Sequence, residues 1–134
     1  MQNKIEKIRQ WAEQNNNELI ALYGFGSYFE GMSNSESDID LAWLGKEKLA
    51  DLERWKMQEE LASLLGKNVD LIDLKSTTTV FRFEIISHAQ LIFCSNSDTA
   101  AFFETYVYSS YLRFQEERKA ILSDVLKRGS VYGG

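Results

Sequence analysis

The chain has 134 residues, of which 44% are hydrophobic and 13% aromatic, so it can form one folded domain and is too apolar to be disordered. Its net charge of −5 argues against a protein that binds nucleic acid by neutralising phosphates, and no direct nucleic-acid partner is expected. No apolar segment approaches the ~20 residues of a membrane helix, and the first ten residues lack the apolar core of a signal peptide. Cys94 is the only cysteine and lies in an apolar run, which predicts a buried, unpaired thiol and fits a cytoplasmic protein.

Hydrophobic periodicity predicts eight elements along the chain. They are helices over 2–16, 47–65, 77–88 and 98–127, and strands over 18–25, 38–44, 69–74 and 90–94. This order is typical of a mixed α/β (α+β) domain, in which a small mixed sheet is flanked by helices. We expect the domain to span residues 1–128, followed by a flexible tail over 129–134.

The helices carry predictions about their faces and ends. The apolar side of the second helix should hold Leu49, Leu52, Trp55, Leu61, Leu64 and Leu65, and that of the last helix Phe102, Tyr106, Leu112, Ile121 and Leu122. The threonine cluster at 77–79 should cap the third helix, and Ser97 or Asp98 the last one.

Two carboxylates, Asp38 and Asp40, stand two residues apart at the start of the second predicted strand. Side chains alternate along a strand, so both should project from the same face. Carboxylates held this close repel one another unless a cation lies between them, and an all-oxygen ligand set suits Mg²⁺. The pair therefore predicts a divalent metal site.

The segment Gly24-Phe25-Gly26-Ser27 ends the preceding strand. Glycine lets a backbone approach a ligand closely, and free N–H groups at a turn bind anions. The Ser27 hydroxyl adds another donor. One loop can thus hold phosphates while the next strand holds the metal that bridges them, as phosphoryl and nucleotidyl transfer require.

A third carboxylate should come from the strand over 69–74, which offers Asp70 and Asp73. The two are three residues apart and therefore point to opposite faces of a straight strand. At most one of them can join the site, and the pattern alone does not choose between them.

Gly26-Ser27, ten further residues and then Asp38-Ile39-Asp40 resemble the signature of the DNA polymerase β-like nucleotidyltransferase superfamily. The short chain and the segment Val69-Asp70-Leu71-Ile72-Asp73-Leu74 are similar to its minimal nucleotidyltransferase (MNT) branch, and within it to the antitoxins of HEPN–MNT toxin–antitoxin pairs. The resemblance covers most of the chain. It implies the polymerase β-like nucleotidyltransferase fold with a long C-terminal helix.

The same resemblance implies a role for each matching residue. Gly26 and Ser27 would contact the phosphates of ATP, and Asp38, Asp40 and Asp70 would bind Mg²⁺, with two ions expected. Asp70 is the first acid of its strand motif, and it would also help to deprotonate the attacking hydroxyl. Asp73 would be structural or solvent-facing.

The implied activity is transfer of AMP from ATP to a tyrosine hydroxyl of a cognate HEPN ribonuclease toxin, which the adduct neutralises. One alternative is a non-catalytic antitoxin that neutralises the toxin by complex formation. Another is a small-molecule nucleotidyltransferase, although such enzymes usually need a further domain to hold the acceptor. The neighbouring carboxylates Asp38 and Asp40 favour an enzyme, because a pure binding protein has no need for them.

The sequence leaves the roles of several other polar and aromatic residues undecided. His88 is expected at a helix end on the surface, and Glu36 is either solvated or touches a metal-bound water. Lys75 and Arg82 could reach phosphate or be ordinary surface charges. The aromatic segment 106–111 could pack in the core or present some of its tyrosines to a protein partner.

Overall fold

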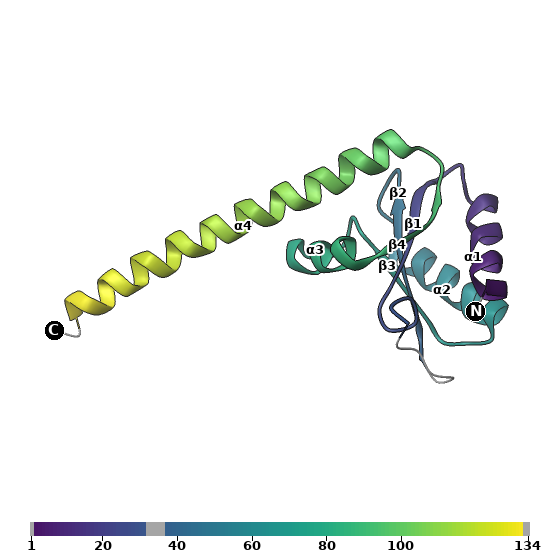
Figure 1. The fold of residues 1–134 in the computed structure, drawn as a ribbon, viewed down its shortest axis with the longest axis horizontal. Helices are drawn as coiled ribbons and strands as arrows, with labels where there is room; N and C mark the ends of the chain where they lie inside the picture. The colour runs from purple at the N-terminus through teal and green to yellow at the C-terminus, as the bar shows by residue number, and fades with distance from the viewer. Residues whose placement is uncertain (1, 32–36, 133–134) are drawn as a thin grey trace.

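The computed structural model describes residues 2–31 and 37–132 (Figure 1). Its elements in chain order are α1 (Gln2–Gln14), β1 (Leu19–Phe25), β2 (Ile39–Gly45), α2 (Asp51–Leu65), β3 (Val69–Asp73), α3 (Thr79–His88), β4 (Gln90–Cys94) and α4 (Ser97–Tyr132). All eight predicted elements are present, and the largest differences are at the start of α2 and the end of α4. Residues 129–132 continue α4, and the division into a domain over 1–128 and a tail over 129–134 stays a prediction.

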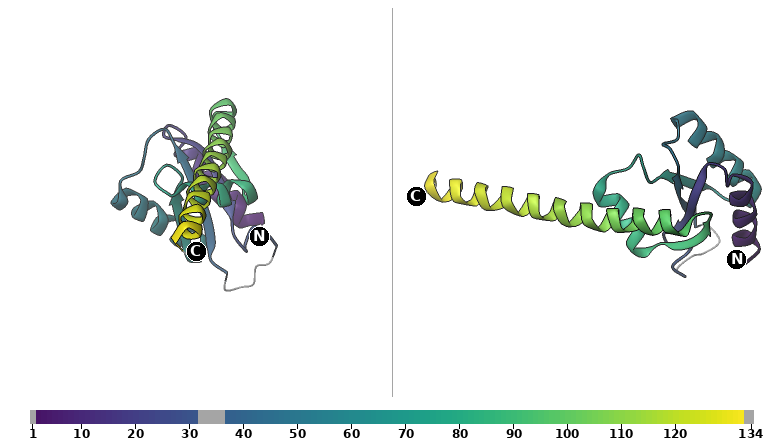
Figure 2. Two further views of the ribbon diagram at one scale, coloured as in Figure 1. Left: turned by 90° about the vertical axis from the view of Figure 1, so that its left-hand side faces the viewer. Right: turned by 90° about the horizontal axis from the view of Figure 1, so that it is seen from above.

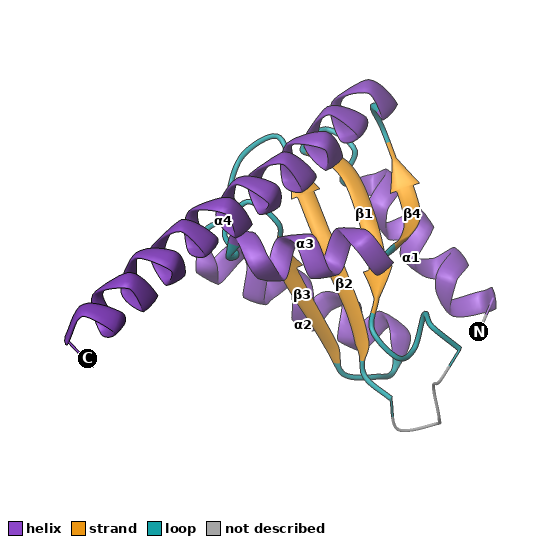
Figure 3. Ribbon diagram, turned by 60° about the vertical axis from the view of Figure 1, so that its left-hand side comes forward, coloured by secondary structure: helices purple, strands orange, loops and turns teal. Residues whose placement is uncertain are grey.

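The four strands form one mixed sheet in the order β3-β2-β1-β4 (Figure 3). β1 is antiparallel to β2 and to β4, and β2 is parallel to β3. The end of β1 therefore lies beside the starts of β2 and β3. Pairing places Phe25 opposite Asp40, and Asp40 opposite Asp70.

Helices cover both faces of the sheet, α1 and α2 on one side and α3 and α4 on the other (Figure 1). β2 alternates between the two resulting cores. Ile39 and Leu41 pack with residues of α1 and α2, whereas Ala42 and Leu44 pack with residues of α3 and α4. Because strand side chains alternate, Asp40 belongs to the face that α3 and α4 cover.

β3 is an edge strand, and α2 holds it in place. The Leu71 N–H donates to Oε1 of Gln58 at 2.9 Å, and Nη1 of Arg54 donates to the Leu71 carbonyl at 3.0 Å. These bonds occupy backbone groups that an edge strand otherwise leaves open to another chain. They also fix the strand that carries Asp70.

The predicted cap of α3 is confirmed, since the Thr78 side chain accepts a hydrogen bond from the Phe81 N–H. The predicted cap of α4 is wrong. The Thr99 N–H donates to Oδ1 of Asn96 at 3.1 Å, because the helix begins one residue earlier than expected.

The predicted apolar faces of α2 and α4 are wrong in part. On α2, Leu61 and Leu65 are buried as expected, but Leu52, Trp55 and Leu64 are exposed. On α4, the five expected residues Phe102, Tyr106, Leu112, Ile121 and Leu122 are all exposed. The inward side of α4 holds Ala100, Phe103 and Val107 instead.

α4 extends as an arm well beyond the rest of the chain (Figure 2). Within the described residues, none of the helices combines the length and the hydropathy needed to cross a membrane.

Candidate active site

The three predicted acidic residues gather at one end of the sheet, where β1 ends and β2 and β3 begin. Asp40 and Asp70 occupy paired positions on neighbouring parallel strands, and Asp38 comes just before β2. Asp70 shares the α3/α4 face with Asp40, because Ile72, two residues further on, packs into the core on that face. The fold therefore brings together carboxylates that are about thirty residues apart in the sequence.

Asp40 is half-buried, and its environment disfavours the charged form. Burial is the main cause, and the nearby carboxylates of Asp70 and then Asp38 add to it, so that the pKa of Asp40 rises from 3.8 to about 6. A bound cation would reverse both effects, because it would replace lost solvation and offset the neighbouring charges.

The donor chemistry of this cluster fits Mg²⁺, which prefers carboxylate oxygens. Across residues 2–31 and 37–132, however, no three His, Cys, Asp or Glu side chains already surround a point that could hold a metal ion. The carboxylates of Asp38, Asp40 and Asp70 are therefore close enough to repel one another without being pre-assembled around one ion.

Gly26 lies directly against Asp40. Its φ angle is +77°, and a Cβ atom at this position would overlap the Oδ2 oxygen of Asp40. Only glycine meets both conditions, since other residues are strained at this φ and carry a Cβ. The glycine motif predicted a close approach of the backbone to a ligand, and in the structure the group that Gly26 approaches is the Asp40 carboxylate.

A single helical turn follows Gly26. The Gly26 carbonyl accepts hydrogen bonds from the N–H groups of Phe29 and Glu30, both at 3.1 Å. Ser27 is exposed at the start of this turn, and the N–H groups of Ser27 and Tyr28 donate no backbone hydrogen bond within the described segments. Free N–H groups at the first turn of a helix are anion donors.

The structure separates the two acids of β3. Asp70 is exposed beside Asp40, whereas Asp73 is only 3% exposed and lies on the opposite face. Asp73 accepts hydrogen bonds from the Leu49 N–H (2.8 Å), the Lys75 N–H (3.0 Å) and the Ser76 hydroxyl (3.0 Å). Asp73 therefore joins the entry of α2 to the end of β3, so of the two roles expected for it, structural or solvent-facing, the structure shows the structural one.

An aromatic pair that the sequence did not predict stands beside the acidic cluster. The rings of Phe25 and Phe81 meet edge to face with centroids 6.3 Å apart, and Phe25 is the strand neighbour of Asp40. Phe81 lies in the first turn of α3 and remains 42% exposed. Phe25 could have been noticed within the glycine motif, but the approach of Phe81 is a tertiary contact without a local signal.

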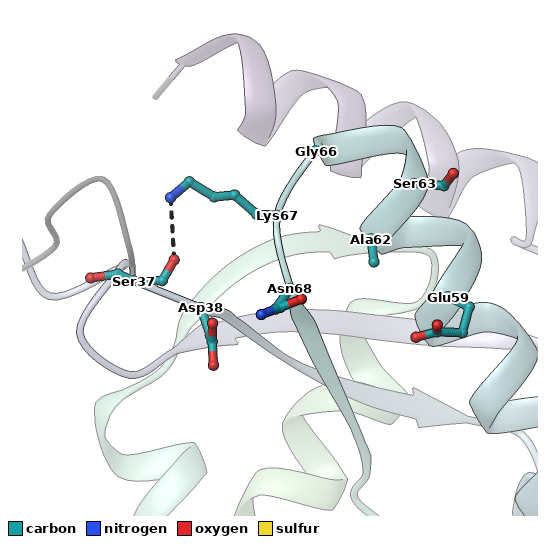
Figure 4. Close-up of a pocket in the computed structure, with 8 residues that line it drawn as sticks. All are labelled: Ser37, Asp38, Glu59, Ala62, Ser63, Gly66, Lys67 and Asn68. Carbon is teal, nitrogen blue, oxygen red and sulfur yellow. Dashed lines mark hydrogen bonds between the residues drawn. The ribbon is translucent and has the colours of Figure 1, made fainter.

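Lys67 holds the two sides of the loop that joins β1 to β2. Its Nζ donates to the Ser37 carbonyl at 3.3 Å and lies 5.9 Å from the ring centroid of Tyr28. Ser37, Asp38 and Lys67 line an open depression of about 570 Å³ (Figure 4). The Asp38 carboxylate points away from Lys67 in this view.

The residues left open by the sequence lie away from the cluster or outside the description. Nζ of Lys75 donates to the Lys46 carbonyl, and Arg82 donates to the carbonyls of Leu74 and Thr77, all at the opposite end of the sheet from Asp40. His88 is exposed at the end of α3, as expected. Glu36 lies outside the described residues.

The aromatic residues of 106–111 divide between two environments. Tyr106 is about half exposed, whereas the rings of Tyr108 and Tyr111 both contact Phe83, edge to face with centroids 5.5 Å apart and stacked with centroids 3.8 Å apart. Cys94, expected in the core, is half-buried and packs against the core on the α3/α4 face.

A glycine-serine turn packed against an acidic pair, with a third acid in register on the next strand, defines a nucleotidyltransferase of the polymerase β type. The chain belongs to the family Polymerase beta, Nucleotidyltransferase, which residues 6–98 match. It is 35% identical over 125 residues to the protein adenylyltransferase MntA of Shewanella oneidensis, covering 93% of this chain and 87% of that protein.

Solved structures of similar proteins agree with this assignment. One is a toxin–antitoxin complex with AMP-PNP, 34% identical with a TM-score of 0.79, over 91% of this chain and 98% of that chain. Another is an MNT antitoxin in complex with the tri-AMPylated HEPN toxin of Shewanella oneidensis, 33% identical with a TM-score of 0.76, over 93% and 98%.

Proposed function

We propose that this chain is an antitoxin with protein adenylyltransferase activity, which transfers AMP from ATP to a tyrosine hydroxyl of a cognate HEPN-family toxin. The observation that carries the proposal is the pairing of Asp40 with Asp70 directly beside the Gly26-Ser27 turn. The similarity to MntA, named a protein adenylyltransferase, and to an antitoxin bound to an AMPylated toxin supports the choice of acceptor.

Each motif residue then has a defined task. The free N–H groups of Ser27 and Tyr28, in the turn that begins at Gly26, bind the phosphates of ATP together with the Ser27 hydroxyl. Asp38, Asp40 and Asp70 hold Mg²⁺, which we take to be two ions. When bound, the metal supplies neutralisation of the charge on the phosphate oxygens.

The transfer is a substitution at the α-phosphorus of ATP. The tyrosine oxygen attacks in line, the bond from the α-phosphorus to the bridging oxygen breaks, and pyrophosphate leaves. Asp70 is exposed beside Asp40 and accepts the phenolic proton. The product is a toxin with a bulky, charged AMP group on its tyrosine, and this group blocks the toxin.

The Asp73 carboxylate takes no part in this scheme, because three protein donors already occupy it on the other face of the sheet. We place the reaction in the cytoplasm, where ATP is available and the single thiol of Cys94 stays reduced.

The proposal is tested with α-labelled ATP, Mg²⁺ and a purified HEPN-family toxin as the acceptor. Label should appear on the toxin with the wild-type chain and disappear with the double variant Asp38→Asn, Asp40→Asn. Glu13→Gln, at an exposed acid of α1 on the other face of the sheet, is the matched control and should retain transfer.

Two results would replace the proposal. Neutralisation of the toxin by the double variant without any label would establish an antitoxin that acts by complex formation alone. Label on a small acceptor such as an aminoglycoside, with none on the toxin, would establish a small-molecule nucleotidyltransferase.

A further inference from the structure

The outer half of α4 carries an apolar face that none of the described residues covers. Every described side chain from Leu112 to Arg128 is exposed. An isolated helix of this length has only marginal stability in water. An exposed apolar face on it therefore indicates that a partner packs there.

This face continues the one that packs against the domain. Ala100, Phe103, Val107 and Tyr111 lie on the inward side of α4, at steps of three and four residues. The same steps lead on to Phe114, Arg118, Ile121 and Val125, with Leu122 adjoining them. We call Phe114, Ile121, Leu122 and Val125 the outer stripe.

The orientation of the outer stripe follows from this continuity. Ala100, Phe103 and Val107 pack with residues of the sheet and α3, so the outer stripe, on the same side of the helix, faces the same way. Figures 1 and 3 show the course of α4 past α3 and the sheet. Asp40 and Asp70 lie on this same face of the sheet, and the exposed Phe81 of α3 contacts Phe25, the strand neighbour of Asp40. A protein that packs on the outer stripe therefore lies on the side of the sheet from which Asp40 must be reached.

We infer that the outer stripe is the surface that docks the acceptor protein and holds its tyrosine near the Asp40–Asp70 pair. This inference rests on the proposed function, because it takes the acceptor to be the HEPN toxin. With the toxin held by contacts remote from the reacting atoms, only its tyrosine side chain then has to move into the site.

The stripe also defines the chemistry of the partner surface. Arg118 lies in the middle of it, and across residues 2–31 and 37–132 its guanidinium forms no ion pair. A complementary surface is apolar at the positions facing Ile121 and Val125 and presents a carboxylate to Arg118.

α4 provides its own matched control. Leu112 and Ile121 are 63% and 64% exposed, and nine residues, or about 2.5 helical turns, place them on opposite sides of the helix. Ile121→Glu should weaken binding of the purified HEPN-domain protein at least tenfold, whereas Leu112→Glu should leave it within about twofold of the wild type. Calorimetry of the two proteins measures this difference, and circular dichroism shows whether both variants keep α4.

Transfer kinetics test whether docking serves the reaction. Ile121→Glu should raise KM for the toxin about tenfold while leaving kcat and the affinity for AMP-PNP with Mg²⁺ unchanged, because the stripe contacts neither ATP nor the carboxylates. A toxin that binds through the stripe without receiving AMP would sustain the inference and refute the proposed function.

Two outcomes would overturn the inference. One is equal binding and equal KM for Ile121→Glu and Leu112→Glu. The other is a dimer of this chain alone, seen by light scattering, that Ile121→Glu dissociates while toxin binding stays intact. The stripe would then pair two copies of this chain.

Discussion

The aspartates at the two ends of β3 have opposite surroundings. Asp70 and Asp73 belong to the same short strand, yet Asp73 is buried among three hydrogen-bond donors, whereas Asp70 faces the carboxylate of Asp40. Hydrogen bonds from the protein stabilise the Asp73 carboxylate, whereas the fold holds the carboxylates of Asp70 and Asp40 together despite their repulsion. Carboxylates without partners are expected where a ligand, rather than the protein, supplies the compensating charge.

The largest expected effect is on catalysis by the uncompensated acids. Asp70→Asn should lower kcat/KM for AMP transfer by about 10³-fold, because a metal ligand and the proton acceptor are lost together. Its melting temperature should not fall, since Asp70 is exposed and repels Asp40. Transfer of α-labelled AMP and a thermal melt measure the two quantities, and a loss of folding would contradict the catalytic assignment.

A smaller loss of activity is expected at the glycine turn. Gly26→Ala combines backbone strain at φ +77° with a collision against Asp40, and a displaced ligand should lower transfer about 10²-fold. Gly31→Ala is the control, because Gly31 has the same φ and no atom of the described residues lies within 4 Å of its added Cβ. Equal activity in the two variants would mean that the contact with Asp40 is unimportant.

The effect at the opposite end should be on stability rather than activity. Asp73→Ala leaves the Leu49 and Lys75 N–H groups without their acceptor and should lower the free energy of unfolding by about 2–3 kcal/mol. Urea denaturation measures this loss. Below the melting temperature of the variant, AMP transfer per folded molecule should match the wild type, and a specific catalytic defect would show that Asp73 belongs to the site.

The smallest expected effect is on the pH dependence of stability, through the carboxylate of Asp40. The folded-state pKa of Asp40, about 6, lies above its ordinary value of 3.8, so between these pH values the folded chain binds more protons than the unfolded chain. This residue therefore makes stability fall as pH rises from about 4 to 6.

Asp40→Asn removes this contribution and should stabilise the metal-free chain at pH 7 by about 1–2 kcal/mol after allowance for solvent screening. The melting temperature should rise by roughly 3–6 °C, and the gain should vanish at pH 4. A gain of the same size at both pH values would show that repulsion at Asp40 is not its source.

Much of this site could be predicted because its residues are local in sequence. The Gly26-Ser27 turn and the Asp38–Asp40 pair lie at strand ends, where alternation and glycine geometry decide what the side chains can do. The choice of Asp70 over Asp73 rested on a family resemblance. The reason for it, the pairing of Asp40 with Asp70, depends on β2 and β3 being parallel and in this register.

The helix faces were less predictable, because exposed apolar residues blur the periodic pattern. On α4 the exposed Phe102 and Leu112 were expected on the packed side, yet the inward side holds Ala100, Phe103 and Val107. The contact between Phe25 and Phe81 could not be predicted at all, since it joins two segments through the fold.

We propose above all that Asp40 and the carboxylates beside it bind a cation together with the nucleotide. Calorimetric titration of AMP-PNP into the wild-type chain, with Mg²⁺ and with EDTA, tests it directly. We predict binding that weakens at least tenfold in EDTA, and an Asp40→Asn variant whose weak binding is the same in both conditions. Equal affinity of the wild-type chain with and without Mg²⁺ would contradict the account.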